Sequence, residues 1–160
     1  DRVDRMGVPF RLALLGENYQ AQPKAFLAAK SRFRDQIVQF GYETTRENYR
    51  NWLSKGPVVV STAEQENFGI SIVEAVRHGC LPLLPDRLSY PEILPKEFHK
   101  HFLYKDENDL VEKLVALLAV PNGFVESRTV LADMFARHAW STVIDNYDRE
   151  LDRLAKIGVG

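Results

Sequence analysis

Two glutamates separated by seven residues, Glu66 and Glu74, are the side chains whose spacing best fits a binding or catalytic site. They lie in the stretch STAEQENFGISIVEAVRHGC, residues 61–80, and the pair Phe68-Gly69 follows close behind the first glutamate. The residues after Gly69 have the apolar spacing of a helix, whose first N–H groups lack partners and whose dipole is positive at that end. Because Gly69 has no side chain, an anion can approach this backbone closely. The turn therefore predicts a phosphate or diphosphate site.

The two carboxylates predict which chemical groups flank that phosphate. Carboxylates are poor phosphate ligands, but they accept hydrogen bonds well from hydroxyls such as those of a sugar and a ribose. A ligand with a hydroxyl-bearing group on each side of a diphosphate is a nucleotide sugar. On spacing alone, a surface helix whose acidic residues simply favour the helix dipole explains the pattern equally well.

Short apolar runs alternate with amphipathic segments along the chain, which is the pattern of a parallel sheet covered by helices. The predicted strands are residues 10–16, 37–42, 57–63 and 80–85, with a short fifth strand in 101–105. The predicted helices are residues 23–36, 44–56, 68–78 and 107–120, followed by a mostly helical, amphipathic tail at 125–157. Pro82 favours an edge-like or early position for the fourth strand. The order of elements predicts a Rossmann-like, doubly wound α/β domain.

The first predicted strand, residues 10–16, is preceded by too few residues to hold another strand and its crossover helix. In a doubly wound sheet of strand order 3-2-1-4-5-6, the missing strand is strand 1, in the middle. We therefore expect a gap in the sheet with unpaired backbone on both sides, filled by a segment upstream of Asp1 or by a partner. The chain also begins at Asp1 in what reads as a helix, which predicts a piece of a longer protein.

Composition sets broad limits on the function. The 160 residues suffice for one domain with a core, and the net charge of −1 gives no global sign of a nucleic-acid or membrane surface. The single cysteine, Cys80, cannot form an internal disulfide, and no apolar run approaches a bilayer span, so we expect a cytoplasmic protein. The four histidines lack metal-ligand spacing, and no metal site is predicted.

The stretch EQENFGISIVEAVRHGCLPLLPD resembles the donor-binding signature of retaining GT-B glycosyltransferases of group 1 (glycosyltransferase family 4). The segments LLGE, FGY, YPEIL and WSTVIDNYDREL resemble further elements of that family, so the resemblance covers nearly the whole chain. It implies that Glu66 is the catalytic residue, in contact with hydroxyls of the transferred sugar. It implies that Glu74 contacts the ribose.

The same resemblance implies the remaining donor contacts. In that family, amides of the Phe-Gly turn hold the diphosphate, and the backbone of the FGY turn meets the nucleobase. The glycine that ends the LLG strand belongs to the same site. The donor-binding residues implied in addition to Glu74 are therefore Asn67, Phe68, Gly69, Ile70, Gly16, Gly41 and Tyr42.

The family also implies the architecture and the substrates. The chain resembles the C-terminal, nucleotide-sugar-binding half of a GT-B enzyme, truncated at its N-terminal side, with no required metal or cofactor. The donor would be GDP-mannose or a UDP-hexose. The N-terminal domain of the same full-length chain would bind the acceptor. The family's diphosphate-binding Arg and Lys follow the strand that is missing here, so the fragment alone is expected to be inactive.

A narrower resemblance concerns the acceptor. The segments VVVSTA, GCLPLLPDRLSYPEILP and FRLALLGE resemble those of glycosyltransferase-like proteins associated with mannosylation of queuosine in tRNA. That family implies GDP-mannose as the donor and a modified tRNA as the acceptor partner.

Two other functions and several residue roles stay open at this point. The fold also suits a non-catalytic nucleotide- or phosphosugar-binding module, or a sugar-nucleotide epimerase. Arg87 can reach a phosphate and Tyr90 can border the base or sugar, but both also fit as ordinary loop residues. The residues of the C-terminal tail predicted to dock on the domain are Trp140, Val143, Ile144 and Tyr147.

Overall fold

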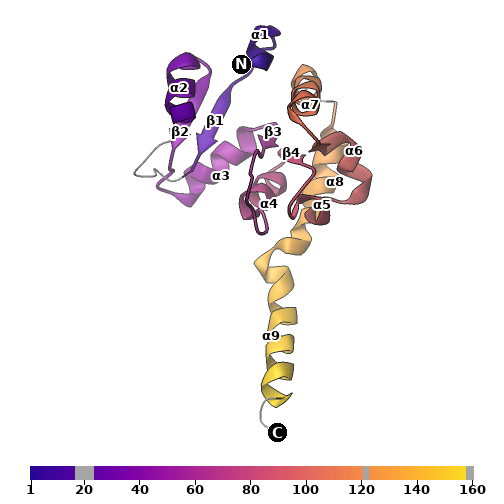
Figure 1. The fold of residues 1–160 in the computed structure, drawn as a ribbon. Helices are drawn as coiled ribbons and strands as arrows, with labels where there is room; N and C mark the ends of the chain where they lie inside the picture. Colours follow the sequence, from indigo (N-terminus) through magenta and orange to yellow (C-terminus); the bar gives the residue numbers. More distant parts are fainter. Residues whose placement is uncertain (17–23, 121–122, 158–160) are drawn as a thin grey trace.

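A computed structural model of the chain describes residues 1–16, 24–120 and 123–157 (Figure 1). Parallel strands alternate with helices, as the sequence predicts. The strands are β1 (Leu12–Leu15), β2 (Ile37–Gly41), β3 (Val58–Val60), β4 (Leu81–Pro85) and β5 (Leu103–Tyr104). The helices up to β5 are α1 (Arg2–Arg5), α2 (Lys24–Arg32), α3 (Arg46–Lys55), α4 (Ile70–Arg77), α5 (Tyr90–Ile93), η1 (Lys96–Phe98) and α6 (His99–Phe102). The helices after β5 are α7 (Glu107–Ala119), α8 (Val125–Phe135), η2 (Ala136–His138) and α9 (Trp140–Ile157).

Strands β1 and β2 form a two-stranded parallel sheet near the N-terminus. Leu12 lies opposite Ile37, and Leu15 lies opposite Gly41 at the carboxyl end of the pair. The Gly16 N–H donates to the Gly41 carbonyl over 3.3 Å. The turns that follow β1 and β2 therefore begin next to each other, at the carboxyl edge of this sheet. None of the nine residues in the two strands is fully buried.

Strands β3, β4 and β5 form a second parallel sheet, with β4 in the middle and all five of its residues buried. The edge-like alternative predicted from Pro82 is therefore wrong, whereas the early-strand alternative is confirmed, because Pro82 is the second residue of β4. Hydrogen bonds from Leu81 N–H to Pro57 and from Ser61 N–H to Leu83 join β4 to β3. On its other side, β4 pairs with β5 only from Leu84 onward. At Pro82, β4 has β3 on one side and no paired strand on the side of β5, so a missing N–H on that second side breaks no ladder bond.

The two sheets are separate, because in the described part of the chain no ladder joins β1 to β3. Figure 1 shows β1 standing apart from β3, with no strand drawn between them. This arrangement agrees with the gap expected for a doubly wound sheet without its central strand. Beside the gap, Leu15 at the end of β1 and Val59 of β3 pack on one small cluster, formed by Leu53, Ala75 and Cys80.

The main hydrophobic core lies around the three-stranded sheet. Leu83 and Leu84 of β4, Leu131 and Phe135 of α8, and Val76 of α4 are completely inaccessible to solvent. Leu117 of α7 belongs to the same core, and Leu110 and Leu114 of that helix pack against it. The mixed α/β architecture with parallel strands is compatible with a Rossmann-like fold.

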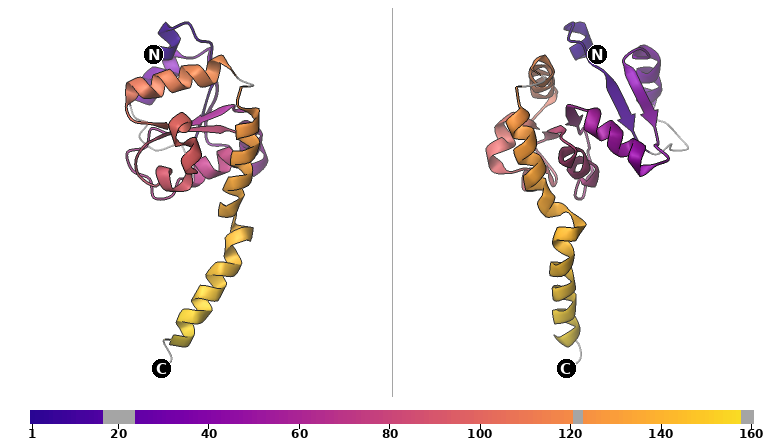
Figure 2. Two further views of the ribbon diagram at one scale, coloured as in Figure 1. Left: turned by 90° about the vertical axis from the view of Figure 1, so that its right-hand side faces the viewer. Right: turned by 180° about the vertical axis from the view of Figure 1, so that it is seen from behind.

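The C-terminal tail consists of two helices joined by the short 3-10 turn η2. Helix α8 packs on the domain, whereas α9 extends away from it (Figures 1 and 2). Val143 and Ile144 are half-buried, but 58% of Tyr147 is exposed, so Tyr147 does not dock on this domain as predicted. The side chain of Trp140 lies outside the described residues. None of the helices in the described ranges has the length and apolar character needed to cross a membrane.

Candidate functional site

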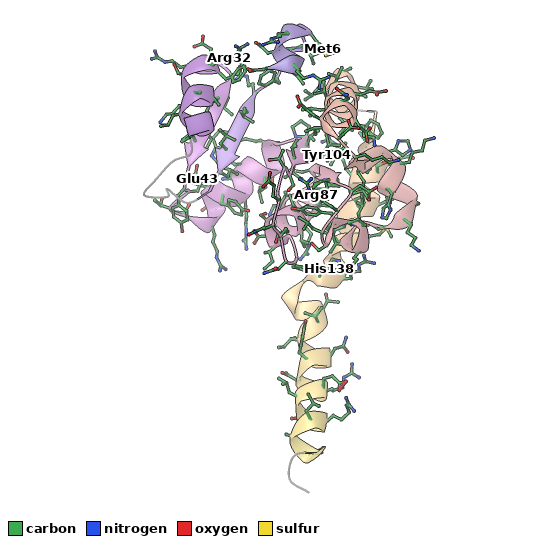
Figure 3. All side chains as sticks on the ribbon, viewed as in Figure 1. Met6, Arg32, Glu43, Arg87, Tyr104 and His138 are labelled. Atoms are coloured by element: carbon green, nitrogen blue, oxygen red, sulfur yellow. The ribbon has the colours of Figure 1, made fainter. Side chains whose placement is uncertain are left out.

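The loop that follows β3 is held in place by side chains from two other elements. The Ser61 hydroxyl shares a 2.7 Å hydrogen bond with the Tyr90 hydroxyl, and the Tyr104 hydroxyl donates to the Ser61 carbonyl over 2.8 Å. Arg87 donates from Nε and Nη2 to the Ala63 carbonyl, and Figure 3 shows Arg87 next to Tyr104. Burial raises the pKa of both tyrosines, so their hydroxyls stay protonated and fix the loop backbone.

This network assigns structural roles to Tyr90 and Arg87. Tyr90 is only 1% exposed, so it does not border a ligand, which was one of the two roles considered from the sequence. Arg87 binds the loop backbone and keeps an exposed side chain beside the turn. Both residues support the loop from beneath or beside it, at the carboxyl edge of the three-stranded sheet.

The turn between this loop and α4 is closed by hydrogen bonds from two backbone amides to a side chain of the loop. The Glu66 carboxylate accepts from the Phe68 N–H at 3.2 Å and from the Gly69 N–H at 2.8 Å. Gly69 adopts a left-handed conformation, φ 82°, and a Cβ there would lie 3.1 Å from Cε1 of Tyr90. The position therefore requires glycine, and α4 begins at Ile70 instead of the predicted Phe68.

The apolar residues on either side of this glycine point outward. Phe68 is 40% exposed and Ile70 is 66% exposed, and Asn67 is exposed as well. The ring of Phe68 contacts the ring of His138 edge-to-face, with 5.3 Å between centroids. Figure 3 shows His138 where the domain body meets α9. Burial, followed by the charge of Arg137, lowers the pKa of His138, so its imidazole is neutral at pH 7.

Helix α4 separates an apolar face from a polar one, as its sequence predicts. Ile72, Val73 and Val76 are buried against the sheet, whereas Glu74 is exposed on the other face. The carboxylate of Glu74 accepts a 3.1 Å hydrogen bond from the hydroxyl of Tyr49 on α3. Sequence analysis missed Tyr49, although it precedes the buried Leu53 by one helical turn and so shares its face.

The remaining predicted residues lie together at the carboxyl edge of the two-stranded sheet. The Gly16 N–H bonds to the Gly41 carbonyl, and Gly41 has φ 111°, a conformation that glycine adopts without strain. Tyr42 follows at once and is 59% exposed. These three residues form one group, and the turn from Glu66 to Ile70 forms another with Glu74.

The two groups are connected through a shared hydrophobic cluster. Leu15 and Tyr49 pack on the same cluster as Val59, which links the end of β1 to α3, α4 and β3. Two pockets of the described surface are lined by other residues, one near Gly7 and Phe10 and one near Asp86 and Lys105. Within the described ranges, no three His, Cys, Asp or Glu side chains form a group that fits a metal ion.

Similarity to curated proteins adds a second, independent line of observation. The chain is 37% identical over 128 residues to a tRNA-queuosine alpha-mannosyltransferase of Drosophila melanogaster, covering 80% of this chain and 33% of that protein. It is 24% identical over 141 residues to a GDP-mannose:cellobiosyl-diphosphopolyprenol alpha-mannosyltransferase of Xanthomonas oryzae pv. oryzae (strain PXO99A), covering 86% of this chain and 37% of that protein. No family model matches the sequence.

The chain thus spans about a third of the length of these two relatives. Both relatives are named as mannosyltransferases, and both matches cover four fifths or more of this chain. This similarity supports a glycosyltransferase-like domain.

Proposed function

We propose that this glycosyltransferase-like domain binds the nucleotide-sugar donor of a retaining GT-B enzyme, and that the enzyme transfers mannose from GDP-mannose. The observation that carries the proposal is the placement of Glu66 and Glu74 on either side of the α4 N-terminus, in a chain similar to two mannosyltransferases. We propose the hydroxyl of queuosine in tRNA as the acceptor, because the Drosophila relative is named for that substrate, and a cytoplasmic location that suits it.

The turn from Phe68 to Ile70 supplies the diphosphate site in this proposal. Backbone N–H groups and the positive end of the α4 dipole stabilise negative charge, which increases on the diphosphate as the bond to the sugar breaks. The Glu66 carboxylate already accepts from two of these amides. Donor and carboxylate therefore compete for them, and donor binding would turn Glu66 outward, where its oxygens can accept from hydroxyls of the transferred sugar.

Glu74 and the β1–β2 edge supply the nucleoside site. The exposed carboxylate of Glu74 lies on α4, a little over one turn beyond the amides, and accepts from the ribose hydroxyls. The nucleobase lies against the backbone of Gly41 and Tyr42, with Gly16 adjacent. Backbone contacts distinguish one nucleobase from another only weakly. We therefore propose GDP as the nucleotide because the name of the Xanthomonas relative includes GDP-mannose, and we keep a UDP-hexose as the competing ligand.

Further parts of the enzyme complete this site. We propose that a strand of the full-length chain fills the gap between β1 and β3, since both strands present unpaired edges there. An N-terminal GT-B domain would provide the acceptor side and the groups that act with Glu66. The chain by itself would bind donor weakly and would not turn over, and we propose no metal or cofactor for the reaction.

The decisive experiment separates sugar binding from nucleotide binding in the full-length protein. Glu66→Ala should lower mannosyl transfer by about two orders of magnitude, because a contact made to the reacting sugar is lost. The same variant should bind GDP at least as tightly as the wild type, since the competing carboxylate is gone. Glu64→Ala is the matched control, because Glu64 is an exposed glutamate of the same loop.

The outcomes also distinguish the competing functions. Calorimetry with GDP, GDP-mannose and UDP-glucose measures donor preference, and transfer to tRNA measures activity. Binding of GDP-mannose without transfer to any hydroxyl would identify a binding module, and conversion of the sugar without an acceptor would identify an epimerase. If Glu66→Ala behaves like Glu64→Ala in transfer and in GDP-mannose binding, the role proposed for Glu66 is wrong.

A further inference from the structure

The hydroxyl of Tyr49 is hydrogen-bonded to a carboxylate oxygen of Glu74, although the two residues lie on different helices. The distance from the Tyr49 hydroxyl to Oε2 of Glu74 is 3.1 Å. In the described part of the chain, the Glu74 carboxylate has no other hydrogen-bond or ion-pair partner. An exposed glutamate normally samples several rotamers, so this one contact selects the orientation of the carboxylate.

Tyr49 is itself held firmly by its surroundings. Its ring is half-buried and packs against the cluster of Leu53, Ala75 and Cys80, which joins α3 to α4. Helix α3 is capped at its start by Thr45, whose hydroxyl accepts from the Asn48 N–H over 3.1 Å. A side chain fixed in this way can hold its hydrogen-bond partner, the exposed Glu74 carboxylate, in one orientation.

The phenol of Tyr49 also has a constant protonation state. Burial, followed by the negative charge of Glu74 and the hydrogen bond to it, raises the Tyr49 pKa to about 12. The group is therefore a neutral O–H donor at every physiological pH. It binds one carboxylate oxygen without neutralising its charge, and Oε1 of Glu74 remains available as an acceptor.

We propose that Tyr49 is a positioning residue that holds the Glu74 carboxylate in the orientation that receives the ribose hydroxyls of the donor. This inference rests on the proposed function, and it adds a residue from α3 to the nucleoside site. Helix α3 follows directly after Gly41 and Tyr42, the turn proposed to meet the nucleobase. The same helix thus connects the base-binding turn to the ribose-binding carboxylate.

A packing role for Tyr49 makes a different prediction, because a packing residue has no connection with any one ligand group. If Tyr49 acts through Glu74, removing its hydroxyl weakens only ligands that carry ribose hydroxyls. If Tyr49 only packs α3 on α4, its loss affects all nucleotides alike. The comparison of GDP with 2′,3′-dideoxy-GDP separates these two cases.

The test uses the full-length protein as wild type, Tyr49→Phe, Glu74→Ala and Thr45→Ala, with calorimetry for GDP and for 2′,3′-dideoxy-GDP. Tyr49→Phe should weaken GDP binding roughly 3- to 10-fold, the usual cost of one hydrogen bond, and leave dideoxy-GDP binding within about twofold of wild type. Glu74→Ala should weaken GDP at least as much. Because the contact is made equally in the ground and transition states, Tyr49→Phe should raise the KM for GDP-mannose and leave kcat nearly unchanged.

Thr45→Ala removes the cap of the same helix and leaves the phenol in place. It should lower the melting temperature without changing the ratio of GDP to dideoxy-GDP affinity. If Thr45→Ala changes that ratio as Tyr49→Phe does, or if Tyr49→Phe weakens both nucleotides equally, the positioning role is overturned. Loss of GDP binding in Glu74→Ala but not in Tyr49→Phe overturns this inference and leaves the proposed function intact. If wild-type protein binds neither GDP nor GDP-mannose, the proposed function itself fails.

Discussion

The two sheets of this domain differ sharply in how well they are buried. All five residues of β4 in the three-stranded sheet are buried, and Leu83 and Leu84 are completely inaccessible. In the two-stranded sheet, every residue of β2 is only half-buried, and Ala13 of β1 is exposed. Strand β4 is buried because β3 pairs with its first three residues, β5 pairs with its last two, and helices α4 and α8 contact it, whereas β1 and β2 pair only with each other in the described part of the chain.

This difference in burial also separates the two turns of the candidate site. The turn from Glu66 to Ile70, which is proposed to bind the diphosphate and is called the phosphate turn here, lies on the well-packed part, where Tyr90 and Tyr104 fix the preceding loop. The turn of Gly41 and Tyr42, which is proposed to meet the nucleobase and is called the nucleobase turn here, lies on the loosely packed part. We expect the phosphate turn to be preorganised and the nucleobase turn to adjust when the gap beside β1 is filled.

The largest expected effect tests the burial difference directly. Leu83→Ala in β4 removes a side chain that is 0% exposed and should reduce the free energy of unfolding by about 2–5 kcal/mol. Leu14→Ala in β1 removes a half-buried side chain and should cost only about 1 kcal/mol. Urea unfolding measures both. Equal losses for the two variants would show that the two-stranded sheet is as well packed as the other.

A second, smaller effect compares one glycine from each part. Gly69→Ala should reduce the unfolding free energy by about 1–2 kcal/mol, because its φ of 82° is unfavourable for alanine and the new Cβ presses on Tyr90. Gly16→Ala should change it by less than about 0.5 kcal/mol, since nothing lies within 4 Å of a Cβ there. Thermal melts of the two variants measure the difference. Equal tolerance at both positions would contradict the strain assigned to Gly69.

The smallest expected effect is a pH dependence on the well-packed side. The folded protein lowers the pKa of His138 below its ordinary value near 6.5, so the unfolded chain binds a proton more readily than the folded one. Stability from this group is present above about pH 6.5 and is lost as the pH falls below it. His138→Phe keeps the ring contact with Phe68 and should flatten the fall in melting temperature between about pH 7.5 and 5.5.

The control for this pH experiment is His101→Phe, which replaces an exposed histidine of α6. The His101 variant should keep the wild-type pH profile. A profile that is flattened by His101→Phe and not by His138→Phe would show that the half-buried ring of His138 does not carry the effect.

Local sequence patterns predicted the strands and helices, but they did not predict features that depend on contacts with neighbouring elements. The strand expected from Ile37 is confirmed, and Thr45 caps α3, because β-branching and capping act within a few residues. Pro82 was expected in an edge-like or early strand position, because a proline removes a ladder bond. Its actual position is tolerated because β5 pairs with β4 only beyond it, which no local rule contains.

The same distinction, between local patterns and contacts across the fold, applies to the residues of the candidate site. Glu66, Gly69 and Glu74 could be selected as candidates from their spacing around one helix start, although the roles predicted for them came from the family resemblance. Tyr49 and the contacts of Tyr90 and Tyr104 with Ser61 were not, because they join elements far apart in sequence. Sequence likewise predicted that Tyr147 would dock, and its helix instead extends from the domain.

By itself, the sequence determined the succession of parallel strands and helices, the glycine at the start of α4 and the two carboxylates around it. Those features follow from backbone preference and side-chain period, which act over one or two turns of chain. Only the tertiary structure decided that Glu66 accepts from the two amides just before α4, that Tyr49 contacts Glu74, and that the described sheet is divided beside β1. These are contacts between surfaces that the chain brings together only when it packs, so their geometry is set by what surrounds each residue in space.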